Sequence, residues 1–153
     1  PVPAPPEPAP TPLAPELQIR PATRADAAAI ATLTPGADAA VVAERLACAT
    51  ALGEPVHVAD RGGIVGCLAW HVVPTLQHGP IARLTFVAVA APHRRSGIGR
   101  RLVDEIARIA AARGLPLLEA VSDIEIENSH GFFRRLGFTQ ASYRFIRAVD
   151  PAG

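Results

Sequence analysis

The sequence predicts a mixed α/β domain, with a central mixed β-sheet of about six to seven strands flanked by about four helices. Three observations support this prediction. Short apolar segments rich in β-branched residues alternate with segments whose apolar residues recur at amphipathic-helix spacing. Arg61-Gly62-Gly63 lies between two strand-like segments and indicates an antiparallel hairpin. Later strands are separated by helices, which indicates parallel pairing, so both kinds of pairing are expected in one sheet.

The chain divides into a tail and a domain. Residues 1–16 are mostly proline and alanine, so we expect a disordered N-terminal segment. Residues 17–150 are expected to form a single domain, because a chain of 153 residues has room for one full core. The expected strands are 17–20, 56–60, 64–73, 84–90, 115–121 and a final strand or pair of strands within 138–148. The expected helices are 24–33, 38–51, 98–113 and 129–136, with a polar loop at 74–80.

Composition excludes several classes of protein. Hydrophobic residues make up 49% of the chain, which indicates a globular protein. The net charge is +1, so the strongly basic surface of a nucleic-acid-binding protein is not expected. All 15 basic side chains are arginine, as is typical of a high-GC bacterial genome. No segment has the roughly 18 apolar residues of a membrane span and no signal peptide is evident, so we expect a cytoplasmic protein that binds no membrane. Cys48 and Cys67 lack metal-site spacing and are expected to be buried free thiols.

Segment 84–113 has the clearest chemistry. An apolar strand ends before Pro92, Ser96 is placed to cap the next helix, and that helix has an apolar face from Ile98 onward. Two glycines and four arginines surround the junction: Gly97, Gly99, Arg94, Arg95, Arg100 and Arg101. Helix N-termini attract anions, and glycines let a ligand approach the backbone, so the segment predicts a phosphate site. A dinucleotide fingerprint would need a third glycine where Leu102 stands, and a P-loop would need a lysine.

Two motifs in this region resemble those of the GNAT superfamily of N-acetyltransferases. Residues 94–99, Arg-Arg-Ser-Gly-Ile-Gly, are similar to its Q/R-x-x-G-x-G/A motif and lie between a strand and a helix, as in the family. Residues 128–138 resemble its later N-x-x-A-x-x-F-Y-x-x-x-G-F segment, and residues 19–23 resemble its first strand and turn. The resemblance covers about residues 18–147. It implies a GNAT-like fold and an N-acetyltransferase.

The resemblance also implies that acetyl-CoA is the co-substrate, and no metal ion is expected. By motif position, the residues that would bind it are Val87, Ala88, Val89, Arg94, Arg95, Ser96, Gly97, Ile98, Gly99, Arg100, Asn128 and Phe133. In the family, the pantetheine arm lies between two strands that splay apart, so the backbone of Val87 and Val89 would bond it. The N–H groups of residues 95–100 would hold the pyrophosphate. Asn128 and Phe133 would contact the distal part of the cofactor.

Acetyl transfer to an amine needs a base for the amine and a way to stabilise the leaving thiolate. Glu119 is the first candidate for the base, because a carboxylate that interrupts an apolar strand must face water, a partner or a site; pairing with an arginine is the alternative. His71 is the second candidate. The tyrosine that commonly protonates the thiolate in the family is Phe133 here. Either another group protonates the thiolate, or the thiolate is released into water without a protein donor, or the site is not catalytic. Tyr143 and His130 are further candidates, for which structural roles are the alternatives.

The acceptor is less constrained than the cofactor. In the family its pocket is formed by the first two helices and by the loops that correspond here to residues 74–80 and 122–128. The second loop contains Asp123, Glu125 and Glu127, which would suit a cationic amine or would simply be solvated. We expect a primary amine of a small molecule or peptide, acetylated by direct attack in a ternary complex. A non-catalytic acyl-CoA-binding module is the main alternative. A third hypothesis, an acetyltransferase that acts on charged tRNA, is disfavoured by the low net charge. A homodimer is possible.

Overall fold

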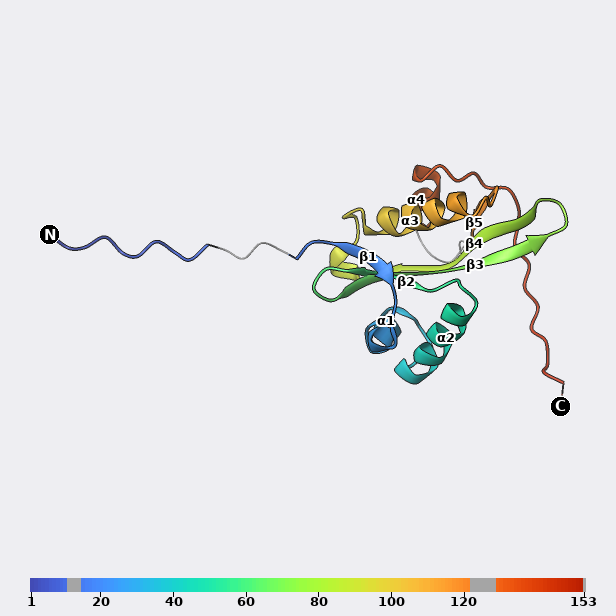
Figure 1. Cartoon of the computed structure of the whole chain (residues 1–153), viewed down its shortest axis with the longest axis horizontal. Coiled ribbons are helices and arrows are strands. Elements are labelled where there is room, and N and C mark those ends of the chain that lie inside the picture. The colour runs from blue at the N-terminus through green and yellow to red at the C-terminus, as the bar shows by residue number, and fades with distance from the viewer. Residues whose placement is uncertain (11–14, 122–128, 153) are drawn as a thin grey trace.

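A mixed five-stranded sheet forms the centre of the molecule (Figure 1). The computed structural model describes residues 1–10, 15–121 and 129–152. Its strands are β1 (Gln18–Pro21), β2 (His57–Asp60), β3 (Ile64–Thr75), β4 (Gly79–Val89) and β5 (Leu118–Ala120). They lie in the order β1-β2-β3-β4-β5, with antiparallel pairing up to β4 and parallel pairing between β4 and β5. The expected mixed sheet is therefore confirmed.

Helices cover both faces of the sheet, as expected (Figure 1). In chain order they are η1 (Arg24–Asp26), α1 (Ala27–Leu33), α2 (Ala39–Ala51), η2 (Ala91–His93), α3 (Ile98–Ala112) and α4 (Ser129–Arg135). Helices α1 and α2 lie on one face, and α3 and α4 lie on the other (Figure 1). Within the described residues, none of the helices combines the length and apolar character that a membrane span requires.

Two apolar clusters hold these layers together. On the α3 face, the buried side chains include Leu68, Trp70, Leu84, Leu102 and Ile106. On the α1 and α2 face, they include Ile30, Val42, Leu46, Val58 and Cys67. The buried side of α3 is the apolar face that its sequence periodicity predicts. Burial of apolar surface on both faces of the sheet is the main stabilising contribution to such a fold.

The prediction of six to seven strands is wrong, because residues 138–148 form no strand in the described part of the chain. Tyr143, Phe145 and Ile146 from this segment are 81%, 92% and 75% exposed. Apolar residues alone do not make a strand, which also needs a paired edge and a face to bury. Strand β5 is also shorter than the expected 115–121. Leu115 still donates to Ala110 at the end of α3, and Pro116 has no N–H to contribute to a ladder.

Other local predictions are also corrected. Strand β4 begins at Gly79, within the loop predicted at 74–80, because the side chain of Thr75 closes a tight turn: it donates to the Gly79 carbonyl and accepts from the His78 N–H. Cys48 is exposed, whereas Cys67 is buried as expected. Residues 1–10 are exposed and form neither helix nor strand, and the disorder expected for residues 1–16 stays a prediction.

Candidate functional site

The loop between β4 and α3 presents backbone N–H groups at the start of a helix. Gly97 is the N-cap of α3 and has φ +81°, a left-handed conformation that favours glycine. The prediction that Ser96 caps this helix is wrong, because its hydroxyl donates instead to the carbonyl of His93. Within the described residues, the backbone N–H groups of residues 95–100 donate no hydrogen bond. They are therefore available to an anion, which the α3 dipole also favours.

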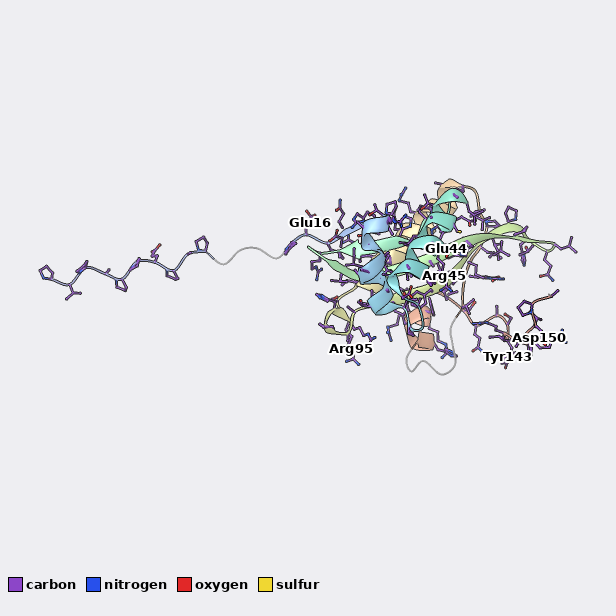
Figure 2. The ribbon with its side chains drawn as sticks, turned by 90° about the horizontal axis from the view of Figure 1, so that it is seen from below. Glu16, Glu44, Arg45, Arg95, Tyr143 and Asp150 are labelled. Carbon is purple, nitrogen blue, oxygen red and sulfur yellow. The ribbon has the colours of Figure 1, made fainter. Side chains whose placement is uncertain are left out.

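The arginines of this loop have different partners. The Nε of Arg94 donates to the carbonyl oxygen of Val89 at 3.1 Å, which ties the loop to the end of β4. Nη2 of Arg100 donates to the carbonyl oxygen of Arg135 at 3.3 Å, which ties α3 to α4. Arg95 is exposed and extends away from the body of the molecule (Figure 2). The loop is thus fixed at both ends and is surrounded by positive charge.

Strands β4 and β5 pair over a short distance near this loop. Ala82, Arg83 and Leu84 of β4 pair with Leu118, Glu119 and Ala120 of β5. Val87, Ala88 and Val89 pair with β3, and their other edge has no partner from β5 among the described residues. The register with β3 shifts between Phe86 and Leu84, so Thr85 forms a bulge in β4. An extended ligand can therefore reach the outer edge of residues 86–89.

A cleft of about 550 Å³ adjoins the same end of β4. It is lined by residues 31–37, which comprise the end of α1 and the start of its connection to α2, by residues 88–91 and by Arg94. Three of the predicted cofactor-binding residues, Ala88, Val89 and Arg94, therefore line a cavity that extends to the loop. This volume suits a small-molecule ligand.

Helix α4 closes the other side of the loop. Ile98 is fully buried, and Gly99 lies so close to α4 that a Cβ atom at this position would be 2.9 Å from Cζ of Phe132. Phe133 packs edge-on against Phe132 and Phe138, with ring centroids 5.1 and 5.4 Å apart. Phe133 is thus part of an aromatic cluster and has no proton to donate. Asn128 and the acidic residues Asp123, Glu125 and Glu127 lie outside the described residues.

The two candidate bases lie in one row across the sheet. His71 of β3 pairs with Arg83 of β4, which pairs with Glu119 of β5, so the three side chains project from the same face. Oε1 of Glu119 accepts a hydrogen bond from the Nε of Arg83 at 2.9 Å and forms an ion pair with Nη2 at 2.8 Å, which is the arginine pairing that the sequence left open. His71 has its Nδ1 3.1 Å from an oxygen of Glu54. All three are half-exposed on their side chains.

Glu54 is the site residue that sequence reasoning missed. It directly follows the glycine that ends α2, is 9% exposed, and contacts a strand 17 residues later. Nothing local in the sequence signals such a contact. Of the other candidates, His130 is exposed on α4 and Tyr143 lies away from the sheet (Figure 2).

Cys67 can be set aside as a nucleophile. Its side chain is 2% exposed, and burial raises the pKa of the thiol to about 11. Because the thiolate is the reactive form, a thiol with so high a pKa is unreactive near neutral pH. Acyl transfer through this cysteine is therefore disfavoured.

Comparison with known proteins gives one family and several relatives. A model described as the acetyltransferase (GNAT) domain matches residues 53–140. An aminoalkylphosphonate N-acetyltransferase of Salmonella typhimurium is 29% identical over 90 residues, which cover 58% of this chain and 58% of the relative. The match thus spans little more than half of the relative's length.

Solved structures show the same fold at low sequence identity. An aminoglycoside 6'-N-acetyltransferase, AAC(6')-Ih from Acinetobacter baumannii, superposes with a TM-score of 0.72 at 20% identity and covers 90% of this chain and 100% of its own. AAC(6')-Iy, solved with a bisubstrate analogue that contains CoA, gives a TM-score of 0.73 at 15% identity over 89% and 99% of the two chains. At such low identity, these similarities establish a shared fold and nothing further.

Proposed function

Because the chain belongs to the GNAT acetyltransferase family, we propose that it is an acetyl-CoA-dependent N-acetyltransferase. The acetyl group would pass to a primary amine of a small molecule or peptide by direct attack in a ternary complex. The main supporting observation is the loop before α3, whose unbonded N–H groups, left-handed Gly97 and surrounding arginines fit a pyrophosphate. An N-acetyltransferase relative at 29% identity supports the amine as acceptor.

The residues take different roles in this proposal. Backbone N–H groups of residues 95–100 hold the pyrophosphate, and the outer edge of Val87 and Val89 orients the pantetheine arm. Phe133 packs beside the bound cofactor but transfers no proton. His71 or Glu119 would remove a proton from the amine. Both lie in the row where β4 and β5 are still paired. Acetyl-CoA supplies the activated thioester.

One observation favours a non-catalytic acyl-CoA-binding module instead. Phe133 stands where the resemblance implies a tyrosine, and its ring packs in an aromatic cluster. A site without this donor can still turn over if the thiolate leaves to water, so binding without transfer is the second candidate function.

Release of free CoA distinguishes these two functions. The full chain is incubated with acetyl-CoA and a panel containing an aminoalkylphosphonate, a polyamine, an aminoglycoside and a peptide with a free N-terminus. Thiol release is followed, and acetylation of the amine is confirmed by mass spectrometry. The proposal predicts amine-dependent release with at least one acceptor class. Tight acetyl-CoA binding without amine-dependent release from any member would support the binding module instead.

A further inference from the structure

Four titratable side chains lie side by side on one face of the sheet. His71 and Glu119 flank Arg83 on three adjacent strands, and Glu54 approaches His71 from the connection between α2 and β2. The charges that face the imidazole are therefore the Glu54 carboxylate on one side and the Arg83 guanidinium, paired with Glu119, on the other. Of these four, Glu54 has the most closely defined surroundings.

Both oxygens of the Glu54 carboxylate are held in place. Strand β2 ends its pairing with β3 at Leu68, so the next part of β3 lacks β2 as a hydrogen-bond partner. Glu54 substitutes for it: Oε1 accepts from the backbone N–H of Val72 at 2.7 Å. Its own backbone N–H donates to Ala49 at the end of α2. The carboxylate is thus oriented by the backbone, and its second oxygen meets the imidazole of His71 at 3.1 Å.

This contact selects one tautomer of His71. A carboxylate only accepts hydrogen bonds, so the Nδ1 atom that faces Glu54 must bear the proton. In the neutral ring Nε2 then has the free lone pair. The side chain of His71 is 40% exposed, whereas that of Glu54 is 11% exposed, so a buried carboxylate orients a ring that ligands can reach.

We propose that Glu54 is a positioning residue that holds His71 as the general base of acetyl transfer, an inference that rests on the proposed function. Nε2 of His71 takes one proton from the acceptor ammonium. The freed amine then forms a bond to the thioester carbonyl carbon, and the carbon–sulfur bond breaks. The remaining excess proton of the amine goes to the departing thiolate, which leaves as the CoA thiol. The imidazolium, stabilised by Glu54, returns its proton to solvent.

Glu119 is less suited to this role. Its Oε1 accepts a hydrogen bond from Arg83 and pairs with its charge, so taking a proton would weaken that ion pair. The structure therefore ranks the two candidate bases: His71 has a free nitrogen fixed by a buried neighbour, and Glu119 is bonded to a cation. Glu119 then helps to keep Arg83 turned toward β5 rather than toward the imidazole.

Glu54→Gln tests the positioning role without removing the bond to Val72. An amide oxygen can still accept from the Val72 N–H, which leaves the amide NH₂ to face His71 and donate to Nδ1. The proton of the ring then moves to Nε2, which can no longer accept. If Glu54 only stabilised the fold through its bond to Val72, Glu54→Gln would leave the tautomer of His71 and the activity unchanged. Glu44→Gln, the same change on an exposed side chain of α2, is the matched control (Figure 2).

Two measurements are made on the full chain. ¹⁵N NMR, with the His71 signal identified by its loss in His71→Gln, reports which ring nitrogen is protonated in the neutral ring. We expect the proton on Nδ1 in the wild type and in Glu44→Gln, and on Nε2 in Glu54→Gln.

Steady-state kinetics with the best acceptor from the panel should show kcat/KM lowered about a hundredfold by Glu54→Gln and by His71→Gln, with unchanged acetyl-CoA affinity.

The outcomes separate this inference from the proposed function. Wild-type His71 protonated on Nε2, or wild-type kinetics in Glu54→Gln, would overturn the positioning role. Full activity in His71→Gln would overturn the choice of base while leaving the acetyltransferase function intact. Absence of turnover by the wild type with every acceptor would reject the function and the base together.

Discussion

At the scale of single residues, the Asp26 carboxylate and Arg20 together connect η1 with strands β1 and β2. It accepts two hydrogen bonds from Arg20 of β1, at 2.8 and 3.0 Å, and one from the Thr23 N–H, at 2.8 Å. Arg20 also pairs with Asp60 of β2 at 3.0 Å. The Arg20 hydrogen bonds lower the pKa of Asp26 to about 2, despite the opposing effect of burial. Thr23 and Asp26 form a capping box at the start of η1.

This carboxylate should make the protein sensitive to acid. The folded-state pKa of about 2 lies below the ordinary value of 3.8, so the stabilisation is present above about pH 4 and is lost as the pH falls toward 2. The contribution at neutral pH is about 2 kcal/mol. Thermal unfolding followed between pH 2 and 6 should show a smaller acid-dependent fall of Tm in Asp26→Asn than in the wild type. Parallel curves for the two proteins would mean that other carboxylates dominate.

At the scale of elements, the α3–α4 contact sets the shape of the loop before α3. Gly99 lies in the first turn of α3, directly under the ring of Phe132. Arg100 bonds the carbonyl of Arg135 at the other end of α4. A side chain at residue 99 would therefore push α4 away from the helix start that presents the N–H groups. Gly99 serves packing, whereas Gly97 supplies the left-handed turn.

Gly99→Val should lower the free energy of unfolding by about 1–3 kcal/mol, because the added Cβ meets the Phe132 ring. The penalty should largely disappear in a Phe132→Ala background, where the space is free and valine has the better helix propensity. Denaturant unfolding of the four proteins in this double-mutant cycle measures the coupling. An equal loss in both backgrounds would show that the glycine is required for a reason other than this contact.

The sequence predicts helices of this fold better than strands. The apolar face of α3 and the stop at Gly114 are local signals, and both match the structure. Strand pairing depends on contacts that are remote in sequence, so residues 138–148 appear strand-like and yet form no strand. The same reason applies to the site. The loop motif could be predicted from adjacent residues, but Glu54 and His71, 17 residues apart, come together only through the sheet.

At the scale of the whole molecule, β4 connects two kinds of chemistry. Its C-terminal end leads to the loop that fits a pyrophosphate, and its middle presents Arg83 between His71 and Glu119. The bulge at Thr85 and the end of the β5 pairing lie between these two regions. A cofactor held at the C-terminal end of β4 could thus direct its thioester toward the row at the middle of the strand. The central claim is that the loop before α3 is where acetyl-CoA binds.

Isothermal titration calorimetry with acetyl-CoA tests this claim most directly. Gly97→Glu places a negative charge among the N–H groups that would hold the pyrophosphate. Gly79→Glu is the matched control, because both glycines have left-handed φ, +81° and +68°, with open space around them. We predict wild-type affinity for Gly79→Glu and a loss of at least about a hundredfold, or about 3 kcal/mol, for Gly97→Glu with its fold intact by circular dichroism. Unchanged acetyl-CoA affinity in Gly97→Glu would contradict the account.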